Sequence, residues 1–265
     1  MPDALKMLLL AVVQGLTEFL PVSSSGHLVL AKELLGFKSL SGLGVELLLH
    51  AGTLLAVFAY YRAFIAKTLL GLFRRDPEAW RFALAVLFSM IPAVLLGLAA
   101  EETLEVLADR PRFVACALLL TGLLLLSTRF FGRDLRRPVT WRAALAMGIA
   151  QAFAMLPGIS RSGSTLSVAR FLGLDRDKAA AFSFLMVVPI ILAGNALHLL
   201  KALGSSSESA FAGLTPGLAA LGFLTAAAVG YASVAWMVRL LNRDRFWLFG
   251  PYCLALGLAA LVVLA

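Results

Sequence analysis

Ser24 and His27 stand three residues apart in the stretch QGLTEFLPVSSSGHL, which runs from Gln14 to Leu28. At the start of a helix, side chains three positions apart can share one face. A hydroxyl beside an imidazole is the arrangement of an activated nucleophile, in which the ring takes the proton of the hydroxyl. Ser-x-x-His is common by chance, but its place inside an apolar segment strengthens the prediction of nucleophilic chemistry here.

A second stretch, PGISRSGST (157–165), repeats the pattern of a proline followed by serines and a glycine. In both stretches we expect the proline to end one helix and the serines to begin another, because serine is a favoured N-cap. Two converging helix N-termini form an anion site, since each presents unpaired N–H groups and a positive dipole end. Arg161 adds a planar fork of donors suited to phosphate oxygens. The residues expected around the anion are Ser23, Ser25, Gly26, Ser160, Ser162 and Gly163.

Glu18 is a carboxylate in a segment that is otherwise apolar. A charge in that position is costly and is a functional candidate by default. Because a carboxylate would repel a phosphate ligand, we expect either a bridging divalent cation or a protonated Glu18 that moves protons. Gln14, one turn earlier on the same face, could supply a neutral oxygen to a hard cation such as Mg²⁺ or Ca²⁺.

Four other polar residues carry weaker predictions. Glu46 and His50 are four apart at the outer end of the first full apolar span, where we favour an interfacial pair over a functional one. His198 is expected at the membrane interface, near the end of its span. Asn195 is expected to form an interhelical hydrogen bond.

The elements that position these residues are membrane helices. The chain of 265 residues is 61% hydrophobic and only 14% charged, whereas soluble proteins are about 25% charged. Its mean hydropathy is +0.92. The net charge of +8 does not indicate nucleic acid, because most basic residues lie between apolar spans. Cys116 and Cys253 lie within apolar runs, and we expect both to be small buried hydrophobic residues.

Apolar segments fall into two kinds. Six are long enough to cross a bilayer: 44–62, 82–100, 113–130, 179–200, 214–240 and 247–265. Two more, 4–36 and 141–172, are interrupted by the Pro-Ser-Gly clusters, so we expect each to form a re-entrant helical hairpin.

The basic residues predict the sides of the membrane. Four loops hold sixteen of the twenty-three Lys and Arg residues and should be cytoplasmic: 62–81, 129–142, 170–178 and 239–245. The loops EETLEVLADRPR (101–112) and GSSSESAFAG (204–213) should lie outside, together with both termini.

The two hairpins then enter from opposite sides, as inverted repeats would. Gln14 and Gln151 are 137 apart, and the same offset lays Ser23, Ser25 and Gly26 over the serines and glycine of the second stretch. We therefore predict an all-α polytopic membrane protein of one domain, 1–265. It would contain two inverted-topology repeats, about 1–131 and 138–265, each a re-entrant hairpin plus three transmembrane helices.

These motifs resemble the undecaprenyl-diphosphate phosphatase family of the bacitracin-resistance type. The resemblance covers essentially the whole chain and rests on two specific motifs, the Gln14 and Glu18 element running into PVSSSGH, and PGISRSGST. It implies hydrolysis of undecaprenyl diphosphate to undecaprenyl phosphate and inorganic phosphate, which recycles the cell-wall carrier lipid and confers bacitracin resistance. It also implies a divalent metal and a place in the bacterial inner membrane, with the active site facing the periplasm.

Residue by residue, the resemblance assigns Ser24 and His27 to the nucleophile and base, and Arg161 to the phosphate clamp. Ser160 and Thr165 are hydroxyls of the second motif. An equally consistent variant makes His27 the nucleophile, through a phosphohistidine. Many members have a second glutamate where this chain has Gln14, which weakens the expectation of a metal site with two carboxylates.

A different class of function also fits the architecture. Inverted repeats with broken helices are typical of transporters, so the chain could carry a polyprenyl phosphate or another anion across the bilayer. A pure transporter needs the anion site but not Ser24 and His27. The expected partners are a polyprenyl diphosphate and the lipid bilayer, without nucleic acid, and homo-oligomerisation is left open.

Overall fold

The computed structural model describes residues 3–35, 43–133, 135–204 and 214–264. This part of the chain is helical throughout, apart from short connections and one isolated β-bridge between Arg137 and Leu174. The elements are α1 (Asp3–Phe19), α2 (Ser24–Leu35), α3 (Leu43–Tyr60), α4 (Arg62–Phe73), α5 (Pro77–Ala108), α6 (Pro111–Phe131), α7 (Trp141–Phe153), α8 (Arg161–Phe171), α9 (Arg176–Leu185), α10 (Val187–Gly204), α11 (Pro216–Asn242), the 3-10 turn η2 (Phe246–Leu248) and α12 (Phe249–Val263).

The structure has five helices that could span a membrane, or six if one bent pair counts as a single span, at the places of the expected spans. Five are suited to cross a membrane by length and composition: Pro77–Leu104, Pro111–Phe131, Arg176–Gly194, Pro216–Asn242 and Phe246–Val263. The sixth is a bent pair, Gly44–Tyr60 and Arg62–Phe73, whose axes differ by 75°. The chain is therefore a multi-pass α-helical membrane protein.

Two expected loops are largely helical instead. Most of 62–81 belongs to α4 and the first turn of α5, and α5 continues through 101–108 with a kink at Ala100. Hydropathy and charge indicate which residues lie in the membrane, but they do not determine where a helix stops. The segments contain good helix formers such as Leu, Ala, Lys and Glu, and α5 ends just before Pro111.

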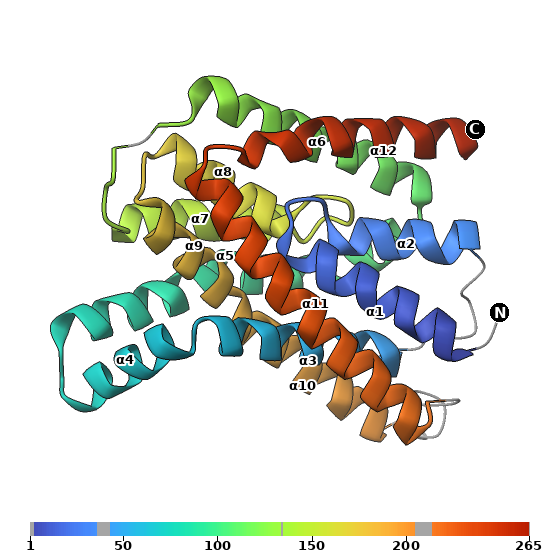
Figure 1. The fold of residues 1–265 in the computed structure, drawn as a ribbon, viewed down its shortest axis with the longest axis horizontal. Helices are drawn as coiled ribbons and strands as arrows, with labels where there is room; N and C mark the ends of the chain where they lie inside the picture. Colours follow the sequence, from blue (N-terminus) through green and yellow to red (C-terminus); the bar gives the residue numbers. More distant parts are fainter. Residues whose placement is uncertain (1–2, 36–42, 134, 205–213, 265) are drawn as a thin grey trace.

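Close helix packing places the two hairpins. The first arm of one hairpin, α1, packs on α11, and the first arm of the other, α7, packs on α5. Figure 1 shows α6 and α12 running side by side. A Cβ at Gly148 would lie 2.2 Å from the carbonyl oxygen of Ser89, and one at Gly15 would lie 2.9 Å from the Cβ of Val229. Small residues at such contacts let membrane helices approach closely.

The four basic segments gather at one end of the molecule. Arg170 donates to the carbonyl of Arg133 at 3.3 Å and forms an ion pair with Asp244, which joins three of them. The fourth shares a cavity with Pro138 and Lys178. In Figure 1 the connections on the left lie opposite the start of α1 and the end of α12. The four segments therefore lie together at one end of the molecule, and the side of the membrane that they face stays a prediction.

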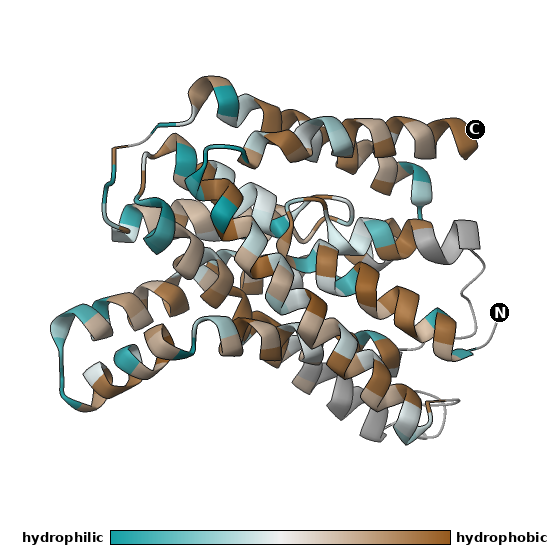
Figure 2. Cartoon of the chain, viewed as in Figure 1, coloured by the Kyte–Doolittle hydropathy of each residue, from teal (hydrophilic) through white to brown (hydrophobic). Residues whose placement is uncertain are grey.

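The outer faces of the helices are apolar. Large hydrophobic side chains stay exposed along the spans, including Leu95, Leu98 and Val262, as lipid contact requires. Figure 2 shows largely brown helices with hydrophilic residues at the left-hand connections. Cys253 is buried as expected, but Cys116 is exposed on this outer surface, because its position on α6 faces away from α12 and the other helices. The side chains of Asn195 and His198 lie outside the described residues.

Candidate active site

Each hairpin breaks and restarts at a serine cap. Ser23 Oγ accepts from the backbone N–H of Gly26 at 3.2 Å, and Ser160 Oγ accepts from that of Gly163 at 3.1 Å. Ser23 has a φ of 68°, a left-handed conformation that costs energy in a residue other than glycine. The predicted serine caps are confirmed at both breaks, 137 residues apart.

The two breaks meet in space, as expected. Ser162 Oγ donates to the carbonyl of Leu20 at 3.2 Å, which joins the second hairpin to the first. A Cβ placed on Gly26 would lie 3.4 Å from the Cα of Gly158. The glycines of both motifs thus allow one loop to lie directly against the other.

Neighbouring spans support the two loops. Thr121 on α6 donates to the carbonyl of Gly158 at 3.0 Å and accepts from the N–H of Ser160 at 3.1 Å. Cys253 on α12 lies 3.7 Å from the carbonyl of Pro21. These contacts satisfy backbone groups that would otherwise be unpaired in an apolar environment.

A polar cavity of about 230 Å³ opens where the loops meet. Six of the expected site residues line it: Glu18, Ser23, Ser24, Ser25, Ser160 and Arg161. The other lining residues are Thr17, His50, Gln151, Ala154, Met155, Ile159 and Ile190.

Glu18 is the centre of the hydrogen-bond network beside this cavity. Its side chain is buried and forms an ion pair with Arg161. Ser24 Oγ donates to Glu18 Oε2 at 2.7 Å, and Gln14 Nε2 donates to the same oxygen at 3.0 Å. His50 Nε2 lies 3.8 Å away from it. The arginine compensates a buried carboxylate that would be strongly destabilising alone.

His27 points away from Ser24. Its Nδ1 lies 2.8 Å from the carbonyl of Ser23 and its Nε2 lies 2.7 Å from the hydroxyl of Tyr252, whose ring stacks on the imidazole. A carbonyl only accepts, so Nδ1 carries the proton, and the Nε2 of a neutral ring accepts from Tyr252. The sequence spacing predicted a hydroxyl–imidazole pair, but the hydroxyl of Ser24 turns back to Glu18 instead.

Other expected residues brace the site without lining the cavity. Gln14 is fully buried beneath Glu18, and Ser162 and the two motif glycines serve the contact between the loops. Thr165 Oγ1 lies 2.6 Å from Ser183 Oγ and 2.9 Å from the carbonyl of Arg161. Thr165 therefore holds α8 against α9.

Two residues that were not predicted to belong to the site, His50 and Gln151, line the cavity. His50 was expected in an interfacial pair, yet it lines the cavity and approaches Glu18, while its Nδ1 lies 2.9 Å from the carbonyl of Glu46. Gln151 also lines the cavity and is 1% exposed. Within the described residues, neither polar atom of its amide has a hydrogen-bond partner. The only sequence signal for Gln151 was its alignment with Gln14 in the repeat.

The donor set around Glu18 does not fit a cation held by Glu18 and Gln14 together. Glu18 Oε1 is engaged by Arg161, and Oε2 accepts from Ser24 and Gln14. Gln14 directs its N–H, not its oxygen, toward Glu18. Among the described residues, no group of three His, Cys, Asp or Glu could hold a metal ion. The divalent metal stays a prediction.

The fold and the site define a multi-pass helical membrane protein with a buried arginine–carboxylate–serine cluster between two broken helices. Residues 7–259 match the family described as bacitracin resistance protein BacA, and the chain belongs to that family. It is 41% identical to the undecaprenyl-diphosphatase of Christiangramia forsetii, over 98% of each chain. It is 38% identical to those of Desulfatibacillum aliphaticivorans, over 97% of this chain and 98% of the relative, and Rubrobacter xylanophilus, over 100% of each.

Proposed function

We propose that the chain is an undecaprenyl-diphosphatase, which hydrolyses undecaprenyl diphosphate to undecaprenyl phosphate and inorganic phosphate. In the cell this would recycle the carrier lipid for cell-wall synthesis and confer bacitracin resistance. The observation that carries the proposal is the hydrogen bond from Ser24 to Glu18 beside Arg161, in one cavity at two helix N-termini. The names of the relatives point to the same activity.

In the proposed mechanism, the diphosphate enters at the helix N-termini and competes with Glu18 for the guanidinium of Arg161. Ser24 attacks the terminal phosphorus, its proton passes to Glu18, and the bond from that phosphorus to the bridging oxygen breaks. Undecaprenyl phosphate leaves, and water then releases the phosphoryl group from Ser24. Arg161 stabilises the negative charge on the transferred group.

We assign the base to Glu18 in place of His27. Glu18 already accepts the hydrogen bond of Ser24, as a base must, whereas both ring nitrogens of His27 are engaged by Ser23 and Tyr252. The same contacts disfavour His27 as the nucleophile, because its Nε2 lone pair is directed at Tyr252. His27 then acts by holding the cap of α2 in place.

Phosphate release by the purified full-length protein tests the proposed function. With undecaprenyl diphosphate in detergent, we expect one inorganic phosphate and one undecaprenyl phosphate for each substrate consumed. A protein that releases no phosphate but moves a prenyl phosphate between the leaflets of vesicles would instead be a transporter.

Gln151 is expected to bind the substrate. Gln151→Leu should lower kcat/KM about 10- to 100-fold, because a hydrogen bond to a charged group contributes about 1.5–3 kcal/mol. The Tm should stay or rise, since two buried unpaired atoms are removed. Ser167→Ala is the matched control, because Ser167 Oγ is also buried and has no partner in the described part of the chain, but does not line the cavity. A normal kcat/KM in Gln151→Leu would contradict the assignment.

Substitution of Gln14 tests whether Glu18 and Gln14 hold a divalent cation together. From the sequence, Gln14→Glu should lower the divalent concentration for half-maximal activity, because added ligand charge raises cation affinity. From the structure, we expect that midpoint to stay where it is, with lower activity, because the new carboxylate competes for Arg161. Titrating Mg²⁺ and Ca²⁺ against activity distinguishes the two, and a midpoint that falls would restore Glu18 and Gln14 as metal ligands.

We further propose that the two halves are inverted repeats. The arms α1 and α7 each pack on a long span of the other half, and the last spans of the halves, α6 and α12, pair with each other. A twofold relation between the halves requires these pairings. The cap serines at equivalent positions support the same relation.

The proposed orientation places the basic segments in the cytoplasm and the active site toward the periplasm. In a background without Cys116 and Cys253, Glu208→Cys should react with an impermeant thiol reagent in intact cells, and Arg75→Cys should react only after lysis. Labelling measured on whole cells decides this, and the reverse pattern would overturn both the orientation and the outward-facing site.

A further inference from the structure

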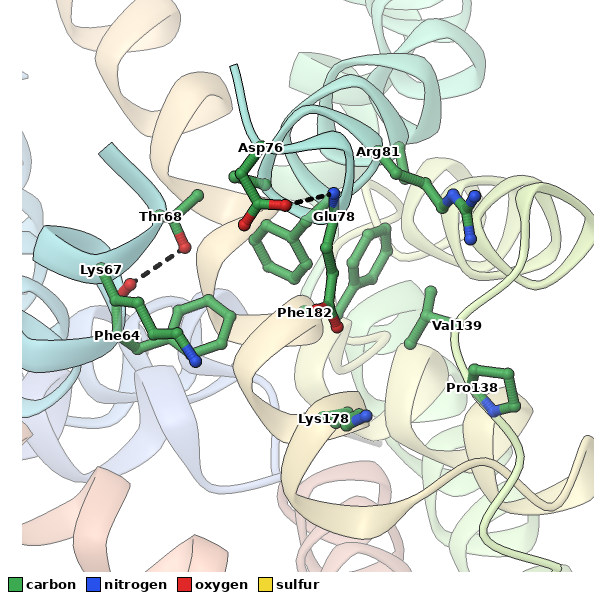
Figure 3. A pocket seen from close by; sticks show the side chains of 13 residues that line it. Phe64, Lys67, Thr68, Asp76, Glu78, Arg81, Pro138, Val139, Lys178 and Phe182 are labelled. Carbon is green, nitrogen blue, oxygen red and sulfur yellow. Dashed lines mark hydrogen bonds between the residues drawn. The ribbon is translucent and has the colours of Figure 1, made fainter. Parts of the chain in front are cut away.

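A second cavity lies at the end of the molecule where the basic segments gather. It measures about 250 Å³ and lies between α4, the start of α5, the connection before α7 and the start of α9 (Figure 3). It shares no lining residue with the candidate active site. Nothing in the proposed hydrolysis uses it.

The cavity has an aromatic floor. The rings of Phe64 and Phe82 meet edge to face with centroids 5.0 Å apart, and those of Phe82 and Phe182 do so at 5.8 Å. Phe182 is completely buried. Packed rings of this kind make a rigid apolar wall that does not collapse into the space above it.

Charges of both signs surround this floor. Lys67, Arg81 and Lys178 line the cavity together with Asp76 and Glu78. Figure 3 shows the Glu78 side chain extending into the middle of the pocket, with lysines from α4 and α9 on other sides of it. Within the described part of the chain, none of these five side chains forms an ion pair. The pocket therefore offers separate cationic and anionic groups to a ligand.

The α4–α5 hairpin, which forms one side of the pocket, has an apolar outer side. Leu69, Phe73 and Trp80 on the adjoining α4–α5 hairpin are 50%, 86% and 46% exposed. Aromatic residues at this level are typical of the membrane–water interface. The hairpin therefore has an outer side suited to lipid and an inner side that lines the pocket. A pocket beside lipid favours a lipid headgroup over a soluble metabolite.

We propose that this pocket binds the headgroup of a phospholipid that carries both a phosphate and a primary ammonium, as phosphatidylethanolamine does. The phosphate would lie against Lys67, Arg81 and Lys178, which are the donors for its oxygens. The ammonium would donate to Glu78 and Asp76. A purely anionic headgroup meets the carboxylate of Glu78, and a quaternary ammonium has no N–H to donate, so both fit less well.

Native mass spectrometry of the full-length protein tests the proposal. The probes are dioleoyl phosphatidylethanolamine, phosphatidylcholine and phosphatidylglycerol, titrated singly into detergent. We expect phosphatidylethanolamine to bind at least about fivefold more tightly than the other two, the scale of one or two partly exposed ion pairs. Equal affinity for the three lipids, or preference for phosphatidylglycerol, would overturn the proposal.

Three variants assign the effect to the pocket. Glu78→Gln should remove the preference for phosphatidylethanolamine, and Lys178→Gln should weaken binding of all three lipids. Arg74→Gln removes an exposed cation near the same hairpin turn that does not line the pocket, and should change nothing. Persistence of the preference in Glu78→Gln would contradict the site. Phosphate release should be unchanged in these variants, so this test is separate from that of the proposed function.

Discussion

Ser24→Ala is expected to reduce phosphate release about 10⁴-fold or more, since losing a nucleophile removes the chemical step while the binding site remains. The Tm should fall only modestly, because the buried Glu18 carboxylate loses one hydrogen bond but keeps its ion pair with Arg161 and its hydrogen bond from Gln14. The measurement is kcat for undecaprenyl diphosphate in detergent, with Tm recorded on the same preparation. Residual activity near that of the unmodified protein would remove Ser24 from the mechanism.

The chemical identity of the covalent intermediate distinguishes Ser24 from His27 as the nucleophile. With substrate labelled in the terminal phosphate, acid quenching should trap an acid-stable phosphoserine that is missing in Ser24→Ala. An acid-labile label that survives in Ser24→Ala would instead indicate a phosphohistidine at His27. Glu18→Gln should lose nearly as much activity as Ser24→Ala, whereas His27→Gln should lose less, because Glu18 is the group in contact with the hydroxyl.

Arg161→Lys should lower kcat/KM about 10²- to 10³-fold, although it keeps the positive charge. Lysine retains the pairing with the buried Glu18 carboxylate, so folding and membrane insertion should persist. It lacks the planar fork that can hold Glu18 and phosphate oxygens together, and arginines in phosphoryl transfer contribute about 10³-fold or more. Near-normal turnover would mean that charge alone attracts the substrate.

Arg170→Lys is the matched control for this prediction. Arg170 is also buried and paired with a carboxylate, Asp244, but at the other end of α8 from the cavity. It also donates a hydrogen bond to the carbonyl of Arg133, in the connection after α6. We expect a lower Tm and normal kcat/KM in the folded fraction, which is the opposite signature to that of Arg161→Lys.

Local features of the sequence determined the fold class and the place of the site. Hydropathy over about 20 residues predicted where the apolar membrane helices lie, and the basic residues predicted connections that gather at one end of the molecule. The serine caps at Ser23 and Ser160 were predictable because capping depends on a few adjacent residues. The repeat offset and the buried arginine indicated that the two breaks meet.

Only the tertiary structure decided which side chains contact one another inside the site. Helical spacing allows Ser24 and His27 to share one face of α2. The imidazole instead forms a hydrogen bond with Tyr252, which is 225 residues away from His27 in the chain. The hydroxyl of Ser24 donates to Glu18, and α3 places His50 close to the same carboxylate. A spacing rule states which residues share a face of one helix. The rotamer that each adopts depends on partners from distant helices, and these are known only once the helices have packed.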